Sequence, residues 1–168
     1  QNANEQNMKD LITSHEHNIY LKPGEVVVAR KPVLVSTVLG SCVAVTLFSP
    51  DRGFGAICHA MLPNAPGQSE DLRYVDAALL HIYRKALECG AANNLVVKLF
   101  GGARVLNVGS AESTGYSVGE QNVARALEVI ASLGLSLAGE DTGGLVGRKL
   151  YFCTRDGDVY LRRMRRIG

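Results

Sequence analysis

The sequence lacks several features that mark broad classes of protein. It has no tryptophan, only 6% of its residues are aromatic, and its formal net charge is only +2. No apolar run approaches the roughly 18 residues of a membrane-spanning helix, so membrane insertion is not expected. A net charge this weak also gives no reason to expect nucleic acid as the main partner. The apolar share of 46% nevertheless excludes a disordered chain and predicts a globular protein.

The cysteines show neither a disulfide framework nor a metal-binding pattern. Cys42, Cys58, Cys89 and Cys153 form no CxxC pair, and no histidine stands at metal-ligand spacing from them. The N-terminus also lacks the basic patch and apolar core of a secretory signal. We therefore expect reduced thiols in a cytoplasmic protein, without a metal site.

Glycine is more frequent than usual. The chain has 18 glycines among its 168 residues, about 11%, against roughly 7% in proteins generally. Their clusters do not have the spacing of phosphate-binding loops, because neither GxGxxG nor GxxxxGK[ST] is present. Such glycines mark either tight turns or places where two backbones approach too closely for a side chain.

The length predicts one domain. The polar residues 1–18 are expected to form a flexible N-terminal segment, and residues 19–168 a single domain. Runs rich in β-branched residues, separated by turn signals, predict most of the strands. The expected strands cover 19–30 (interrupted by a turn at 22–25), 33–37, 43–48, 54–62, 95–100, 135–140, 150–154 and 159–163.

Two helices are predicted, and together with the strands they define the fold class. Apolar residues recur every three or four positions over 72–86, and Gly90 provides a stop. Ser117 and Glu120 form a capping box for the second helix, which Gly134 ends. Because strands and helices do not alternate throughout, we expect an α+β fold: a β-rich, sandwich-like core with the two helices packed on one face.

Cys42 differs from the other cysteines because it follows a small-residue corner between two predicted strands. An ordinary buried cysteine is inert, which is what we expect of Cys89 and Cys153. At the corner, however, the N–H groups of Ser41 and Cys42 are expected to point away from the sheet. An exposed thiol beside such donors has the arrangement that a nucleophile and an oxyanion site require.

A base for this thiol is expected on the next strand. If the hairpin turns near Asp51-Arg52, the numbers of paired residues sum to 102 or 103, which places Cys42 opposite Ala60 or Met61. His59 is then one or two positions away, within reach of Cys42. A register slip of one residue would turn His59 to the other face, so a structural histidine stays an alternative. Cys58 itself points away from the face of His59.

A third group would orient the imidazole, and no carboxylate is well placed for this locally. Ser36 and Thr37 precede Cys42 in the approaching strand. Counting in steps of two puts Ser36 on the same face as Cys42 and Thr37 on the opposite face. We therefore prefer Ser36, with Thr37 as the alternative.

Several segments together resemble the chemoreceptor glutamine deamidase family, CheD. They occur in the family's order over residues 20–150 or so, and their combination is far more specific than any one of them. The segments are Leu21 with Pro23-Gly24-Glu25, TVLGSCVAV at 37–45, HAMLP at 59–63, KLFGGA at 98–103, VGEQNV at 118–123, and DTGG at 141–144 with GRK at 147–149.

The resemblance implies a bacterial cytoplasmic enzyme that hydrolyses glutamine side chains of methyl-accepting chemotaxis receptors to glutamate and ammonia. Cys42 would be the nucleophile and His59 the general base and acid, with Gly40 and Ser41 at the oxyanion or substrate site; no cofactor is implied. The family usually has a threonine six residues before the cysteine, where this chain has Ser36. The chain also has Gln121 where the family segment, interpreted as IGxRNV, has arginine.

The family also binds the chemotaxis phosphatase CheC. A non-enzymatic adaptor that binds CheC and receptors is therefore the main alternative, and a thiol enzyme acting on other amides is another.

Six glycines lie within the segments that carry the resemblance, and we expect them to gather around the Cys42 corner. They are Gly40, Gly101, Gly102, Gly143, Gly144 and Gly147.

Overall fold

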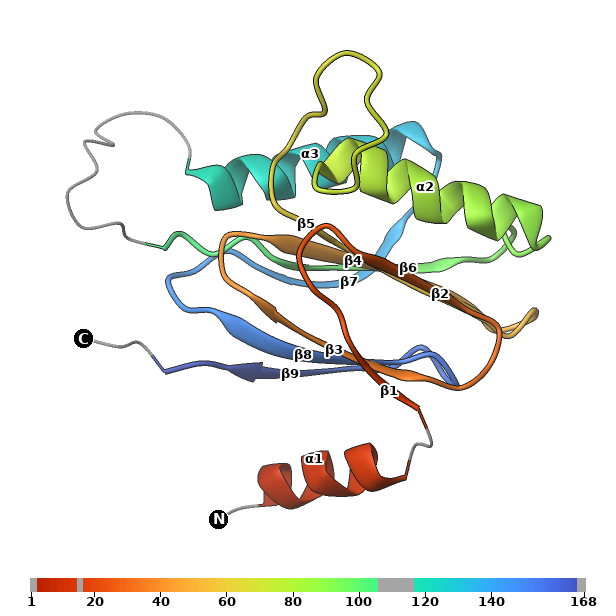
Figure 1. Ribbon diagram of the computed structural model, residues 1–168, viewed down its shortest axis with the longest axis vertical. Coiled ribbons are helices and arrows are strands. Elements are labelled where there is room, and N and C mark those ends of the chain that lie inside the picture. The colour runs from red at the N-terminus through yellow and green to blue at the C-terminus, as the bar shows by residue number, and fades with distance from the viewer. Residues whose placement is uncertain (1–2, 15–16, 106–116, 166–168) are drawn as a thin grey trace.

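The computed structural model, which describes residues 3–14, 17–105 and 117–165, contains two stacked β-sheets with helices outside them (Figure 1). The strand order is β1-β3-β8-β9 in the four-stranded sheet and β2-β5-β4-β6-β7 in the five-stranded sheet. The strands are β1 (Asn18–Tyr20), β2 (Val26–Ala29), β3 (Leu34–Leu39), β4 (Val43–Ser49), β5 (Phe54–Ala60), β6 (Val96–Gly101), β7 (Leu137–Thr142), β8 (Arg148–Cys153) and β9 (Val159–Arg163).

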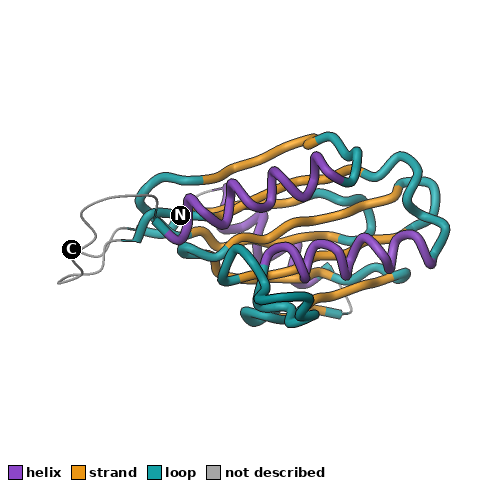
Figure 2. Tube along the Cα trace, turned by 90° about the horizontal axis from the view of Figure 1, so that it is seen from above, coloured by secondary structure: helices purple, strands orange, loops and turns teal. Residues whose placement is uncertain are grey.

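Two helices, α2 (Val75–Glu88) and α3 (Val118–Ser132), cover the outer face of the five-stranded sheet. They lie side by side over the strands when the molecule is seen from above (Figure 2). A third helix, α1 (Ala3–Thr13), lies on the opposite side of the molecule, beyond the four-stranded sheet. The predicted α+β class, with a sandwich-like core and two main helices on one face, is therefore confirmed.

The five-stranded sheet separates two apolar cores. One core, between the sheet and the helices, includes Val45, Cys58 and Leu79. The other, between the two sheets, includes Ala44, Ile57 and Phe152. Because neighbouring residues of a strand point to opposite faces, consecutive residues of β4 and β5 belong to different cores.

The β4–β5 hairpin has one of the two registers expected from the sequence. Ala44 pairs with His59 and Val43 with Ala60, so paired numbers sum to 103. The capping box of α3 is also present, with Ser117 and Glu120 bonded to each other's backbone N–H groups. Gly90 and Gly134 follow α2 and α3 with positive φ, as helix stops do.

The N-terminal part of the chain contains more structure than the sequence indicated. Within the expected flexible segment 1–18, helix α1 occupies residues 3–13, whereas residues 1–2 and 15–16 lie outside the described part. Helix α2 also begins later than expected, at Val75. The N–H groups of Met61 and Leu62 both donate to the carbonyl of Arg73, which ties this segment to the end of β5 instead of the helix.

None of the described helices is long and apolar enough to cross a membrane.

Candidate active site

The chain crosses from one sheet to the other at the residues expected to carry the nucleophile. Strand β3 belongs to the four-stranded sheet and β4 to the five-stranded sheet, so residues 40–42 connect the layers. Two backbone hydrogen bonds fix this corner: the N–H of Gly102 donates to the Cys42 carbonyl (2.8 Å) and that of Ala103 to the Gly40 carbonyl (2.9 Å). The Cys42 side chain remains partly exposed. The thiol is therefore held at an accessible edge between the sheets.

His59 lies on β5 and faces the core between the sheets. It pairs with Ala44 on β4, and it is 1% exposed. Cys58, its neighbour, is also 1% exposed but belongs to the core under the helices. Cys58 and His59 thus point to opposite faces, as expected from the strand period.

Thr37 fixes the orientation and the protonation of the imidazole. Its Oγ1 lies 2.7 Å from His59 Nδ1 and donates its only proton to the carbonyl of Leu21, also at 2.7 Å. With that proton committed, Oγ1 has only lone pairs for the imidazole and must accept a hydrogen bond from Nδ1–H. The neutral ring therefore carries its proton on Nδ1 and a lone pair on Nε2, which is the form that acts as a base.

Thr37, and not the preferred Ser36, is the hydroxyl that contacts His59. Thr37 is fully buried, whereas Ser36 is only half-buried on the other side of β3, where it pairs with Tyr20 and Tyr151. The preference for Ser36 assumed that the alternation of faces continues to Cys42. It does not, because the corner at residues 40–42 is outside any strand and breaks the period of two.

The thiol and the imidazole are near in register but not hydrogen-bonded. Cys42 stands two residues before the partner of His59 on β4. The Nε2 atom of His59 is buried and has no hydrogen-bond partner. An unpaired buried polar atom is unfavourable, so this nitrogen is ready to accept a proton from a nearby donor.

Burial shifts the pKa of both groups. Burial lowers the pKa of His59 from 6.5 to about 4, although the negative charge of Glu25 partly opposes this shift. Burial also raises the pKa of the Cys42 thiol, partly opposed by the residue's own backbone N–H. Both changes favour the uncharged forms, so the resting pair is a thiol and a neutral imidazole.

The corner also presents backbone donors. Among the described residues, the N–H groups of Ser41 and Cys42 have no backbone acceptor, whereas the Ser41 carbonyl is held by the side chain of Asn122 at 3.0 Å. N–H groups without a backbone acceptor beside a thiol are suited to hold a negatively charged oxygen. The expectation that Gly40 and Ser41 lie at an oxyanion or substrate site stays a prediction.

Comparison with known proteins identifies the family. A family model described as CheD chemotactic sensory transduction matches residues 61–163. A probable chemoreceptor glutamine deamidase CheD 2 of Geobacter sulfurreducens is 44% identical over 150 residues, which cover 89% of this chain and 91% of the relative. A probable chemoreceptor glutamine deamidase CheD of Maridesulfovibrio salexigens is 41% identical over 169 residues, covering 95% and 96%. The chain belongs to the CheD family.

The family membership confirms the resemblance inferred from the sequence. Cys42 and His59 precede the segment that the CheD family model matches. The match to the family model therefore assigns no role to these two residues, and their roles have to be inferred from the geometry of the corner. The same holds for Thr37, Gly40 and Ser41.

The glycines of this CheD chain gather at the corner, as predicted. A Cβ on Gly101 would collide with the carbonyl oxygen of Cys42, and a Cβ on Gly147 would lie 3.0 Å from the Leu39 carbonyl oxygen. Gly101 has a φ of 105°, which also disfavours any side chain. Glycine at positions 101 and 147 therefore permits close backbone packing at the corner.

The remaining glycines of this group join the corner through hydrogen bonds. The N–H of Gly143 donates to the Gly101 carbonyl (2.9 Å), and the carbonyl of Gly144 accepts from Arg104 (2.8 Å). Arg148, which was not predicted as a site residue, stabilises the loop that contains Gly143 and Gly144. Its buried guanidinium donates to Asp141 and to the carbonyl of Gly143, each at 2.8 Å. A charged residue inside a predicted strand gave no sign of this role.

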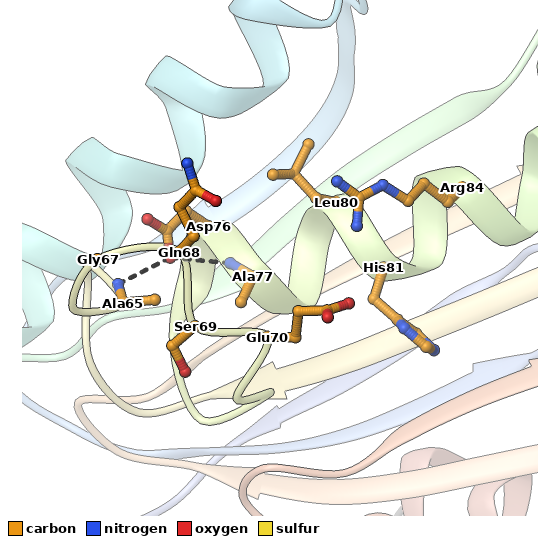
Figure 3. Close-up of a pocket in the computed structure, with 10 residues that line it drawn as sticks. All are labelled: Ala65, Gly67, Gln68, Ser69, Glu70, Asp76, Ala77, Leu80, His81 and Arg84. Carbon is orange, nitrogen blue, oxygen red and sulfur yellow. Dashed lines mark hydrogen bonds between the residues drawn. The ribbon is translucent and has the colours of Figure 1, made fainter.

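Hollows lie beside helix α2 and beside the corner. One, of about 510 Å³, is formed by the loop before α2 and by α2 itself, with Glu70, Asp76, His81 and Arg84 among its lining residues (Figure 3). None of the residues proposed for catalysis lines it. A second, mainly apolar hollow of about 450 Å³ borders the corner, since Gly102 and Gly143 line it together with Gln121.

Within the described residues, no group of three or more histidine, cysteine, aspartate or glutamate side chains is arranged to hold a metal ion.

Proposed function

We propose that this protein is a chemoreceptor glutamine deamidase, which hydrolyses glutamine side chains of methyl-accepting chemotaxis receptors to glutamate and ammonia. The observation that carries the proposal is the Thr37–His59 contact, because it leaves a basic Nε2 lone pair next to the corner that holds Cys42. The names of the relatives supply the substrate: both are described as probable chemoreceptor glutamine deamidases.

In the first half of the reaction, His59 Nε2 accepts the proton of the Cys42 thiol while the sulfur attacks the carboxamide carbon. Since the pKa of the thiol is raised and that of the imidazole lowered, the proton moves during the attack and not before it. The missing hydrogen bond between the two residues is compatible with this step, because catalytic contacts often shorten only when substrate binds. The N–H groups of Ser41 and Cys42 hold the oxyanion.

In the second half, the imidazolium returns its proton to the departing nitrogen, and ammonia leaves behind a thioester on Cys42. Nε2 then accepts a proton from water, whose oxygen attacks the thioester carbon. Glutamate is released, and the proton returns to the sulfur. Thr37 can accept the Nδ1–H bond in both the neutral and the charged ring, so it holds the imidazole in place throughout.

The proposal includes a cytoplasmic location. No disulfide joins any of the four cysteines, all of which lie in the described part of the chain, and Cys42 and Cys89 are partly exposed. Free thiols at such positions are typical of a reducing compartment. The cytoplasmic parts of chemoreceptors are then the accessible protein substrate.

The test measures ammonia release from receptor cytoplasmic fragments, with the +1 Da change from glutamine to glutamate mapped by mass spectrometry. The wild type and Cys58→Ala are expected to release ammonia, and Cys42→Ala to release none. Cys58→Ala is the matched control, since it removes a thiol from the other face of the same sheet. Equal rates for wild type and Cys42→Ala would rule out Cys42 as the nucleophile.

If the wild type releases no ammonia from any receptor, the adaptor alternative takes precedence. Its partners would be the receptors and the CheC phosphatase, and binding to CheC is measured separately by titration calorimetry. A mass change other than +1 Da would indicate a thiol enzyme with a different amide substrate.

A further inference from the structure

We propose that Asn122 is a positioning residue, which holds the Ser41–Cys42 peptide so that the Cys42 N–H faces the substrate. This inference deepens the proposed function and rests on it. Asn122 lies in the second turn of α3 and is fully buried. It acts through the backbone of the corner and not by touching substrate.

The side-chain amide of Asn122 joins the corner that carries Cys42 to the segment that directly follows β5. Its Nδ2 donates to the carbonyl of Ser41 and to that of Met61, each at 3.0 Å. Ser41 directly precedes the thiol, and Met61 follows His59 by two residues. One side chain thereby fixes the spacing between the nucleophile corner and the end of β5.

The bond to Ser41 also sets the direction of the proposed oxyanion donor. The Ser41 carbonyl and the Cys42 N–H belong to one peptide unit, which is planar and trans. In a trans unit the C=O and N–H vectors point in opposite directions. Because Asn122 holds the carbonyl toward α3, the Cys42 N–H must point away from the helix.

Helix α3 is a rigid support for this contact. Its start is fixed by the capping box of Ser117 and Glu120. Gly119 packs so closely on the backbone of residues 102–103 that a Cβ would collide with the carbonyls of Gly102 and Ala103. The same residues donate the two hydrogen bonds that fix the corner. The amide of Asn122 therefore extends from helix α3, which is itself packed against the backbone of the corner.

The contacts of Asn122 leave one of its buried polar atoms without a hydrogen-bond partner, which is unfavourable for stability and points to another role. Because both neighbours of the Nδ2 atom are carbonyl oxygens, that atom must be the donor nitrogen, which leaves Oδ1 buried without a hydrogen-bond partner. Unpaired buried oxygens are uncommon in native proteins and call for an explanation. Precise placement of the Cys42 N–H supplies one.

The experiment compares Asn122→Asp with a matched control, Thr154→Val. The aspartate has the same shape but no donor, so both carbonyls would face an oxygen. Thr154 is the control because its buried hydroxyl also joins backbone groups, those of Lys31 and Val33, at a place remote from Cys42 in the fold. Receptor-fragment deamidation, thermal stability, and amide hydrogen exchange of Gly102 and Ala103 are measured for each.

For Asn122→Asp we expect kcat to fall by about 100-fold, as when an oxyanion donor is lost, with KM changed by no more than about threefold because the donor acts in the transition state. The amides of Gly102 and Ala103 exchange faster. If Thr154→Val lowers the melting temperature as much as Asn122→Asp does, it should still keep the kcat of the wild type. The amides of Gly102 and Ala103 should then also exchange as they do in the wild type. Asn122→Ser, which leaves space for water at the two carbonyls, replaces the aspartate variant if the latter does not fold.

Unchanged kcat in a folded Asn122 variant overturns the proposal, and so does an equal fall of kcat in Thr154→Val. Failure of the proposed function is a different outcome, in which the wild type itself releases no ammonia. The exchange measurement needs no substrate and still decides the positioning role in that case: unchanged exchange of Gly102 and Ala103 in the variant rejects it.

Discussion

Cys58 and His59 are consecutive residues of β5, yet they lie in two very different environments. On one face, Cys58 is sealed between the sheet and the helices, where burial raises the pKa of its thiol to about 12. On the other, His59 is equally buried but contacts Thr37 and lies near the partly exposed Cys42. The first face is a conventional apolar core, and the second combines burial with a fixed polar contact.

The comparison shows that burial alone does not make a reactive site. Burial raises the pKa of both thiols, but only Cys42 stands at an opening where a substrate can reach it. On the face of His59, Ile57, two residues earlier, is packed among apolar side chains, whereas His59 itself contacts the hydroxyl of Thr37. The proposed chemistry thus lies at the end of the sandwich where the chain changes sheets.

The largest expected difference between the two faces is in thiol reactivity. In native protein at pH 8, we expect iodoacetamide to alkylate Cys42 at least about 100-fold faster than Cys58, because only the accessible thiolate reacts. Peptide mass spectrometry after timed quenching gives both rates in one sample, and unfolded protein provides the control in which the rates converge. Similar rates in native protein would show that the Cys58 face is not sealed.

The next effect concerns acid stability. The folded-state pKa of His59, about 4, lies below the usual 6.5, so the unfolded chain binds a proton that the folded protein does not. The contribution of His59 to the free energy of unfolding is thus fully present above about pH 6.5. It falls by about 3 kcal/mol as the pH drops toward 4. Urea unfolding at several pH values should show this loss in wild type and a correspondingly smaller loss in His59→Asn. Identical pH dependence would mean that His59 is not held neutral.

The smallest of the three effects separates Thr37 from Ser36. Thr37→Val removes the hydroxyl but keeps the shape, so we expect kcat for deamidation to fall by about 10- to 100-fold, the equivalent of one buried hydrogen bond. Thr37→Ser should restore most of the activity, and Ser36→Ala, the matched control on the other side of β3, should change it less than about twofold. A larger loss from Ser36→Ala than from Thr37→Val would return the orienting role to Ser36.

Local features of the fold could be predicted well from the sequence. The β4–β5 register follows from the position of the turn at residues 50–53, because hairpin pairing is set by the turn. The start of α3 follows from its capping box, and the ends of α2 and α3 from glycines with positive φ. Helix α1 was missed because its polar sequence has no apolar periodicity strong enough to predict it.

The candidate site could be predicted only in part. Cys42 and His59 emerged from local spacing and from the resemblance to the CheD family. The choice between Ser36 and Thr37 could not be made correctly, because a period of two holds only within a strand and residues 40–42 interrupt it. Asn122 and Arg148 were missed because they reach the corner from α3 and β8, which are far from it in sequence.

The sequence by itself determined most of the strands and the helices α2 and α3, which residues turn the chain, and which cysteine follows a small-residue corner, since these depend on neighbours within a few positions. It also determined the excess of glycine. Only the tertiary structure decided that Gly101 packs against the Cys42 carbonyl, that Thr37 fixes the protonation of His59, and that Asn122 holds the peptide before the thiol. Each of these contacts joins separate strands or a helix and a strand, and its geometry is set by how the layers pack.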